Sequence, residues 1–538
     1  MRREDQERAV VEVVDRVVEA VRLAAEAGGP SVEEVAADVL YTERLRLEAA
    51  APTRAAKQEQ AFYREAARRL RRVSATEQLE LVRRMAERFA REVLGYFDPA
   101  IYELSTRVLP VASGLLVNAV SPLSLFARLP RLPDLGDRIE IRGAVDRLRE
   151  AAARGTVVLA PTHQSHMDSI VMGYALFKMG LPPFTYGAGL NLFGNPLLSF
   201  FLRHLGAYRV DRKKKNALYK AVLKEYAAVS IEYGYHNLFF PGGTRSRSGA
   251  VERRLKLGLL GAGLQALVQN LRRGRERSTV CVVPCTVSYG LVLEAQTLIE
   301  DHLQEEGKSR YIIEDDEFSE PRRIFNFVRN LISLDSRIVL NVGEPFDPLG
   351  HRVAPDGRSL DDRGAPVDLA AALSVAGRPA PDPERDEELT RRLGRSVVAE
   401  LQRQATFLPT HLLAFATFGL LRERAPDRDL FRFLRTAGEL GGVPLDDVYP
   451  ALERLRDGIA ARAAEGRLGP DAVPFGFDPQ EVVHEGLRYF GTYHTHPVLA
   501  RRGDRLFPGD PNLLFYYRNR LDGFGLDERI TGRPEAAA

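Results

Sequence analysis

The chain has 538 residues and a formal net charge of +3, and 45% of its residues are hydrophobic and 28% charged. The length favours two or three domains, and the composition fits a folded protein, either soluble or bound to a surface. So small a net charge gives no general argument for a nucleic-acid partner. The only cysteines, Cys281 and Cys285, are too few for a disulfide framework, and we expect them to be buried structural residues rather than metal ligands.

Residues 1–105 are predicted to form a helical N-terminal domain. The opening MRREDQERAV mixes charges of both signs without an apolar core, which is not the pattern of a signal peptide. Apolar residues then recur at near-helical spacing, with arginine and glutamate on the other face; they are Val10, Val11, Val13, Val14, Val17, Val18 and Val21. The sequence of this region contains no obvious catalytic or binding motif.

Two uncharged segments, 108–127 and 405–421, come near the pattern of a membrane-spanning helix. Such a helix needs about 20 mostly apolar residues. The first segment holds two prolines and an asparagine, and the second is shorter and contains Pro409 and His411. We therefore expect each to be either a buried core helix or a segment that dips into a membrane surface.

Residues 106–346 show a different pattern, in which short apolar runs alternate with helical stretches. The runs are 156–160, 237–240, 280–284 and 337–342, and the helical patterns cover about 168–180, 214–233 and 255–272. This alternation predicts an α/β domain with a mostly parallel sheet, flanked by the helical N-terminal and C-terminal regions. In such sheets ligands gather beyond the carboxyl ends of the strands.

The remaining chain divides by composition. Residues 347–390 are rich in Pro, Gly, Asp and Arg and are predicted to be a linker or long loop. Residues 391–538 are predicted to be mostly helical, although the last seventy mix Gly, Pro, His and aromatics and are hard to assign.

A polar motif, PTHQSHMDS at 161–169, follows the first apolar run. His163 falls where the strand is expected to end, and Asp168 falls near the start of the next helix, where free N–H groups favour a carboxylate. The spacing allows Asp168 to reach back to the imidazole, and a histidine held by a carboxylate is a general base with a fixed tautomer. The alternative is that Asp168 only caps the helix and His163 is an ordinary loop histidine.

A basic segment follows, which includes HLGAYRVDRKKKN at 204–216. The span 203–256 holds 13 Lys and Arg against 4 Asp and Glu, a local net charge of +9. This charge suggests an anionic partner: a phosphate, the phosphates of coenzyme A, or an anionic membrane surface. A solvated basic face is the alternative. Nucleic acid is less favoured, because few aromatics are interleaved and no motif of that class is present.

A third segment, FFPGGTRSRSG at 239–249, has the composition of a phosphate cradle. Its two glycines let backbone N–H groups approach an anion closely, and the donors that follow are Thr244, Arg245, Ser246 and Arg247. It lacks the Gly-Lys-Ser/Thr ending of a P-loop, and a plain glycine turn is the alternative. A fourth segment, VCVVPCTVSYG at 280–290, contains Pro284, which we expect at the edge or end of a strand.

In this order the four segments resemble the blocks of the glycerol-phosphate acyltransferase family, in its bacterial glycerol-3-phosphate and dihydroxyacetone-phosphate branch. They read HQSHMD, a His-x4-Asp block, then GAYRVDR, FPGGTRSR and VVPCTVSYG. The stretch 188–207 is similar to the family's sequence before its second block. NLLFYYRNRL at 512–521 looks like the tail of the larger bacterial glycerol-3-phosphate enzymes.

The resemblance implies a mechanism and a set of site residues. His163 would deprotonate the acceptor hydroxyl and Asp168 would orient it, and backbone N–H groups near a helix start would hold the oxyanion. Arg212 and Arg245 would hold the acceptor phosphate. The same pocket would be shaped or lined by Gly243, Thr244, Ser246, Arg247 and Pro284. No metal or cofactor is expected; the acyl group would come from acyl-CoA or from acyl carrier protein.

Two positions depart from the family pattern. Gly242 stands where the third block usually has a glutamate that is tied to acceptor binding or activity. In the second block Arg209, Asp211 and Arg212 mix the charge, so only Arg212 is carried over.

The sequence therefore predicts acyl transfer to the sn-1 hydroxyl of glycerol 3-phosphate, in phospholipid biosynthesis. The expected location is the cytoplasmic side of the cell membrane, as a peripheral or monotopic protein. Acylation of dihydroxyacetone phosphate or lysophosphatidate is an alternative. A non-catalytic membrane-surface homologue, which has lost turnover with the glutamate at position 242, is another; a nucleic-acid partner is not expected.

Overall fold

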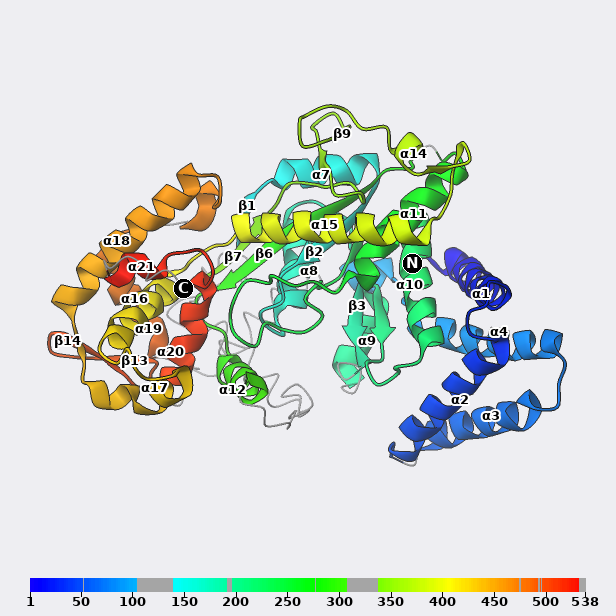
Figure 1. Ribbon diagram of the computed structural model, residues 1–538, viewed down its shortest axis with the longest axis horizontal. Coiled ribbons are helices and arrows are strands. Elements are labelled where there is room, and N and C mark those ends of the chain that lie inside the picture. Colours follow the sequence, from blue (N-terminus) through cyan, green and yellow to red (C-terminus); the bar gives the residue numbers. More distant parts are fainter. Residues whose placement is uncertain are drawn as a thin grey trace.

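The computed structural model describes residues 1–51, 53–103, 139–190, 196–275, 277–306, 337–473, 476–491, 494 and 496–531. Within these, a seven-stranded sheet lies at the centre (Figure 1). Its order is β1 (Ile139–Gly143), β7 (Ile338–Val342), β6 (Val280–Tyr289), β2 (Thr156–Pro161), β5 (Asn237–Leu238), β3 (Thr185–Gly189) and β4 (Ala207–Val210).

The sheet is mostly parallel, which confirms the predicted α/β class. β6, β2, β5, β3 and β4 run parallel, whereas β7 is antiparallel to β6 and carries β1 parallel to itself. β2 and β6 are buried along their whole length and rich in valine, as expected of strands covered on both faces.

Pro284 lies inside β6, so its expected position at a strand edge or end is wrong. β6 pairs with β2 up to Cys285 and with β7 from Cys285 onward. Alternate N–H groups of a strand face the same side, and the N–H of Val282 donates to Phe346. The missing N–H of Pro284 therefore faces residues 343–345, beyond the end of β7, where the regular ladder has stopped.

Helices pack around the sheet, and each contacts particular strands or neighbouring helices. α10 (Ala217–Glu232), α11 (Leu257–Arg272) and α15 (Pro383–Arg403) pack on one another and against β2 or β6, and α15 crosses in front of the sheet in Figure 1. α7 (Val145–Arg154) contacts β2, and α8 (Asp168–Lys178) contacts β1. α9 (Pro196–His204) contacts β4, and α12 (Ala295–Glu306) follows β6.

The N-terminal region is helical within the described residues and has a core of its own. It comprises α1 (Arg3–Glu26), α2 (Val32–Glu48), α3 (Arg54–Leu70) and α4 (Ala75–Val93). Capping boxes of Ser and Glu open α2 and α4. α10 separates this core from the main one: Tyr219 and Val222 pack with the N-terminal helices, while Ala228 and Ile231 belong to the sheet core.

The stretch 347–390, predicted as a linker or long loop, contains short elements and two residues of the main core, Leu349 and Leu373. β8 (Arg352–Val353) pairs with β9 (Ser359–Leu360), α14 (Leu369–Ala372) follows, and β10 (Ser374–Val375) pairs with β11 (Arg378–Pro379). α15 then begins at Pro383, with the Asp382 side chain accepting a hydrogen bond from a first-turn N–H.

The C-terminal region shares one continuous core with the sheet. α16 (Pro409–Glu423) packs against most of the later helices. The remaining elements are α17 (Leu430–Thr436), η4 (Ala437–Leu440), β12 (Val443–Pro444), α18 (Leu445–Ala464), η5 (Pro470–Ala472), α19 (Pro479–Phe490), β13 (Leu499–Arg502), β14 (Arg505–Pro508), α20 (Pro511–Arg518), η6 (Asn519–Leu521) and α21 (Asp527–Thr531).

The structure describes one of the two uncharged segments and not the other. The segment 405–421 is largely α16, which is buried along almost its whole length, so it is a core helix. The segment 108–127 lies outside the described residues. In the part of the chain that the structure describes, no helix is both long and apolar enough to cross a membrane.

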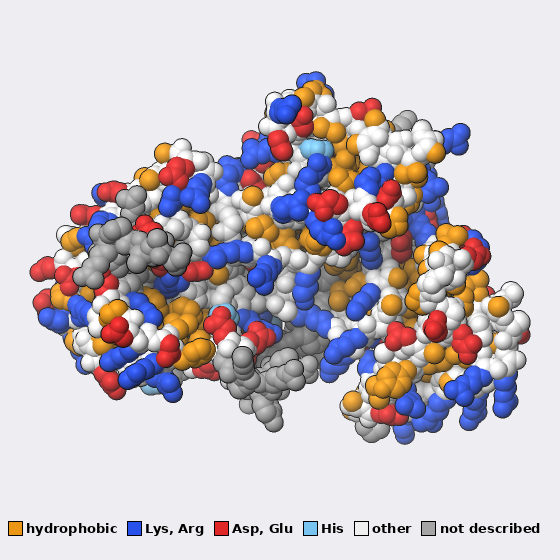
Figure 2. All heavy atoms as spheres, viewed as in Figure 1, with side chains coloured by type: hydrophobic (Ala, Val, Ile, Leu, Met, Phe, Trp, Pro, Cys, Tyr) orange, Lys and Arg blue, Asp and Glu red, His pale blue; other side chains and the backbone are white. Residues whose placement is uncertain are grey.

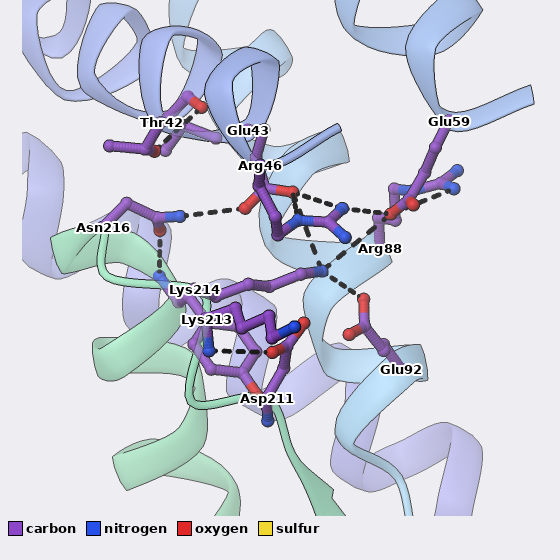
Figure 3. A network of polar contacts seen from close by, with 12 residues as sticks. Thr42, Glu43, Arg46, Glu59, Arg88, Glu92, Asp211, Lys213, Lys214 and Asn216 are labelled. Atoms are coloured by element: carbon purple, nitrogen blue, oxygen red, sulfur yellow. Dashed lines mark hydrogen bonds and ion pairs between the residues drawn. The ribbon is translucent and has the colours of Figure 1, made fainter. Parts of the chain in front are cut away.

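A buried lysine of the basic segment ties the N-terminal helices to the sheet domain (Figure 3). Lys214 follows β4, and its Nζ lies 2.5 Å from Glu92, 3.9 Å from Glu43 and 4.0 Å from Glu59. The ammonium also lies 4.7 Å from the ring centroid of Phe89. Lys214 thus faces the protein interior and not a substrate or membrane, unlike its exposed neighbours in the run.

We expect Lys214→Met to destabilise the docking of the N-terminal helices by about 3–5 kcal/mol, because it removes the buried cation that pairs with Glu92 and shares Glu43 and Glu59 with Arg46. Urea unfolding, read together with protease cleavage within residues 1–93, measures the effect. Lys215→Met is the matched control, since Lys215 is exposed. Equal effects of the two substitutions would contradict a structural role for Lys214.

Candidate active site

His163 and Asp168 meet in the loop between β2 and α8. His163 Nδ1 donates to Asp168 Oδ2 at 2.7 Å. The same oxygen accepts the N–H groups of Gln164 at 2.7 Å and Ser165 at 3.0 Å. Oδ1 accepts the hydroxyl of Tyr289 at 2.6 Å. The carboxylate is fully buried, and four donors compensate its lost hydration.

This geometry decides between the two alternatives for Asp168. Although Asp168 is the first residue of α8, its side chain points back into the preceding loop and does not cap the helix. His163 is accordingly not an ordinary loop histidine but one oriented by a carboxylate. The predicted pair is formed; its catalytic role stays a prediction.

The imidazole of His163 is left with one nitrogen available for chemistry. With Nδ1–H donated to Asp168, the neutral ring carries its lone pair on Nε2. The ring stacks on Phe240, with centroids 4.2 Å apart and planes 20° apart, and 16% of the side chain is exposed. No residue that the structure describes hydrogen-bonds to Nε2, so this atom can accept a proton from a bound hydroxyl.

The predicted phosphate cradle packs directly on His163. Ser246 N–H donates to the carbonyl oxygen of His163 at 2.7 Å. His163 N–H in turn donates to Glu252 Oε1, also at 2.7 Å. Gly243 has a φ of +76°, and a Cβ there would lie 2.5 Å from Cδ of Lys256, so this turn requires glycine. The N–H and the carbonyl oxygen of His163 are thus both hydrogen-bonded to one loop, which contains Ser246 and Glu252.

Arg245 of the predicted cradle reaches the His163–Asp168 loop through Glu294. Its Nη1 is 3.7 Å from Glu294 Oε1, and Glu294 accepts from Ser165 Oγ at 3.1 Å and from His166 N–H at 2.8 Å. The side chain of Arg247 pairs instead with Glu305 on α12. Thr244 is exposed on the same turn.

The other two predicted residues lie apart from this cluster. Pro284 sits on β6 opposite Ala160, the penultimate residue of β2, and therefore below the catalytic loop. Arg212 is exposed two residues beyond the end of β4, the strand at the sheet edge. Because β2 and β4 run in the same direction, Arg212 and His163 share the carboxyl edge of the sheet, with β5 and β3 between their strands.

The expectation that N–H groups near a helix start hold an oxyanion stays a prediction, but the loop before α8 narrows where they can lie. Every backbone N–H from 163 to 168 is already engaged. The acceptors are Glu252 for 163, Asp168 for 164 and 165, Glu294 for 166, Ser165 Oγ for 167 and Ser165 O for 168. The N–H groups of residues 163 to 168 are therefore all engaged within the protein itself.

Sequence reasoning missed four residues around the pair: Tyr289, Glu294, Glu252 and Arg520. Tyr289 ends the quoted fourth block and Arg520 lies in the quoted C-terminal tail, so both had a signal. The buried Arg520 donates to Val287 O at 3.1 Å and to Ser288 Oγ at 2.7 Å, which brings the tail behind the site. The two glutamates belong to no motif, and only folding places them here.

Two of these residues have shifted pKa values. Burial, opposed by the hydrogen bond from His163 N–H and by the charge of Arg520, raises the pKa of Glu252 from 4.5 to about 7. Burial and the neighbouring Asp168 carboxylate raise the pKa of Tyr289 well above 10, so its hydroxyl remains a hydrogen-bond donor.

We expect Glu252→Gln to alter the pH dependence of stability. A folded-state pKa above the unfolded value means that the native chain binds the proton more tightly, so this group's contribution is full below pH 4.5 and lost as pH rises to about 7. The variant should therefore gain stability over the parent between these pH values, by up to ~3 kcal/mol, and no further above pH 7. Unfolding free energies at several pH values test this; exposed Glu453→Gln should show no such trend.

Comparisons with known proteins agree with this geometry. The family model described as Acyltransferase matches residues 140–288, which include the β2–α8 loop and the cradle. The chain is 30% identical over 331 residues to a protein of Ectopseudomonas mendocina named "Glycerol-3-phosphate acyltransferase", covering 61% of this chain and 36% of that protein. Proteins of the same name from Pseudomonas paraeruginosa and Xylella fastidiosa are each 29% identical, over 54% and 53% of this chain.

The aligned part spans only about a third of the length of these curated relatives, from 30% to 36%. The similarity to these relatives is thus one of a shared region. The family model covers the strands and loops that carry His163, Asp168 and Ser246. Residues 140–288 match the acyltransferase family model.

Proposed function

We propose that this chain transfers a fatty acyl group from a thioester to the sn-1 hydroxyl of glycerol 3-phosphate. The observation that carries the proposal is the 2.7 Å hydrogen bond from His163 Nδ1 to a fully buried Asp168, which leaves Nε2 as a base. The acyltransferase domain and the name of the relatives support the reaction type and the acceptor.

In the proposed reaction, Nε2 of His163 takes the proton of the acceptor hydroxyl as its oxygen attacks the thioester carbonyl carbon. Asp168 stays ionised and stabilises the imidazolium. When the tetrahedral intermediate collapses, the carbon–sulfur bond breaks and the thiolate leaves, and the imidazolium proton neutralises it. The products are an ester and a free thiol, and the steps use no metal or cofactor. Acyl-CoA and acyl carrier protein both supply the required thioester.

The acceptor phosphate is assigned to the cradle. Arg245 pairs with Glu294, which binds the catalytic loop, and Ser246 is fixed against His163. Arg247 and Arg212 add charge at the same edge of the sheet, where Arg can bind phosphate in a bidentate way. In Figure 2, Lys and Arg side chains gather over the middle of the molecule, between the two helical regions. Dihydroxyacetone phosphate or lysophosphatidate would present the same phosphate.

A catalytic role is favoured over a non-catalytic homologue by what lies beside Gly242. The carboxylate of Glu252 fills the space next to this glycine and binds the backbone of His163. The site therefore does not lack a carboxylate at this place.

We expect His163→Ala and Asp168→Asn each to lower thiol release by ~10²–10⁴-fold, because they remove the base or its orientation. The assay supplies a long-chain acyl-CoA or acyl carrier protein with glycerol 3-phosphate and follows the free thiol. His484→Ala is the control, since that histidine is exposed on α19. Activity that survives His163→Ala would rule out the proposed base.

We place the reaction at the cytoplasmic side of the membrane, with the protein bound peripherally. Leu190 and Phe200 are 40% and 43% exposed, and Leu190 directly follows β3 at the carboxyl edge that also carries His163. Apolar side chains exposed beside basic residues such as Arg203 suit an anionic lipid surface.

We expect Leu190→Ser with Phe200→Ser to reduce sedimentation with phosphatidylglycerol-containing vesicles by about fivefold or more, since each buried apolar side chain contributes ~1.5–3 kcal/mol. Phe177→Ser is the matched control: Phe177 is 47% exposed, but it lies near the far end of α8, away from this edge. Equal loss in both variants, or no loss in the first, would contradict this surface.

A further inference from the structure

Glu252 takes no part in the chemical steps of the proposed reaction, yet its side chain contacts the backbone of the base. It lies in the loop that joins the cradle to α11, and its Oε1 accepts the N–H of His163 at 2.7 Å. The residue as a whole is partly exposed, but its Oε2 is buried and is hydrogen-bonded by none of the described residues. A carboxylate is therefore kept in a poorly solvated place, where it costs stability, to hold one backbone group.

Apart from Nε2, the other hydrogen-bonding groups of His163 are already engaged. Asp168 fixes Nδ1 of His163, Phe240 stacks on its ring, and Ser246 N–H binds its carbonyl oxygen. The bond to Glu252 is the remaining constraint, and it is strengthened where the Glu252 carboxyl is ionised, as the pH rises past its pKa of about 7. Without this bond, the peptide unit between residues 162 and 163 can rotate and displace the His163 side chain. A displacement of the base by ~1 Å can lower the rate by ~10²-fold.

The glycine at position 242 is explained by the same carboxylate. Gly242 does not have the positive φ of its neighbour Gly243, so its backbone accepts any residue. The constraint is a tight contact: a Cβ at 242 would lie 3.2 Å from Cγ of Glu252, and at the ordinary contact distance of 3.5 Å from its Oε1 and from the carbonyl oxygen of Thr244. Glu252 cannot move aside easily, because its carboxylate is bound to His163.

We propose that Glu252 is a positioning residue for His163, and that its carboxylate occupies the place that a side chain at position 242 would take. Its effect on turnover rests on the proposed acyl transfer. The mutual exclusion of side chains at 242 and 252 does not, since it follows from packing alone. The two parts can thus fail separately.

The first experiment compares Glu252→Ala, Glu252→Gln and the exposed control Glu453→Ala. Glu252→Ala should lower kcat by about 10–100-fold with KM within about twofold, because Glu252 touches the base and not the substrate. Glu252→Gln should stay within about threefold of the parent, since its amide oxygen can accept the same N–H. An unchanged kcat in a folded Glu252→Ala variant would overturn the inference, as would a Gln variant no better than Ala.

The second experiment moves the carboxylate. Gly242→Glu alone should lower kcat by about tenfold or more, because two side chains and two carboxylates then compete for one space. Combined with Glu252→Ala, the same substitution should recover at least about tenfold over Glu252→Ala alone. A double variant no more active than Glu252→Ala would overturn the shared placement.

A stability cycle separates this inference from the proposed function. If the parent transfers no acyl group to any phosphate-bearing acceptor, the proposed function fails, and urea midpoints are read instead. Gly242→Ala should lower the midpoint of the parent but should have little effect in the Glu252→Ala background. Additive effects of the two substitutions would show that the positions do not share space, and the inference would then be wrong on its own terms.

Discussion

Asp168 has no exposed surface, and its two oxygens accept four hydrogen bonds, from His163, Gln164, Ser165 and Tyr289. A buried carboxylate needs such donors, because burial removes the water that would otherwise solvate it. Satisfying it folds the β2–α8 loop back on itself and links that loop to β6 through Tyr289. The imidazole is presented with Nε2 outward as a consequence of that folding. The same closure engages the N–H groups of Gln164 and Ser165 just before α8.

The surroundings of the loop are assembled from distant parts of the chain. The cradle loop contributes Ser246 and Glu252, the segment after β6 contributes Glu294, and the C-terminal tail contributes Arg520. Several carboxylates are thereby concentrated around one histidine, and buried Arg520 partly offsets their charge. The C-terminal region shares its core with the sheet, so it is part of the wall of the site and not a separate attachment.

The N-terminal helices are joined to the rest in another way. α10 packs one face on the sheet and the other on these helices, and Lys214 adds a buried cation among Glu43, Glu59 and Glu92. The basic run after β4 therefore has two uses. Lys214 holds the helices, whereas its exposed neighbours contribute to the field at the carboxyl edge.

The sequence alone determined the local structure and the central pair. Valine-rich runs and helical periodicity located β2, β7, α8, α10 and α11 closely, because these patterns depend on residues near one another in the chain. The spacing of His163 and Asp168 was short enough for their contact to be anticipated. The resemblance to acyltransferase blocks brought Ser246 and Arg245 to the same site.

Tertiary structure decided which polar groups are buried next to one another and which strand is antiparallel in the sheet. β7 is antiparallel to β6, and Pro284 lies inside β6, because pairing depends on neighbours distant in sequence. In a run of three lysines nothing marks the buried one, since only packing separates Lys214 from its neighbours. In the sequence, Gly242 indicates that the glutamate usual at this position is missing. In the structure, the carboxylate of Glu252 lies next to Gly242. The sequence could not show this, because hydrogen bonds and van der Waals contacts depend on distance in space and not on position in the chain.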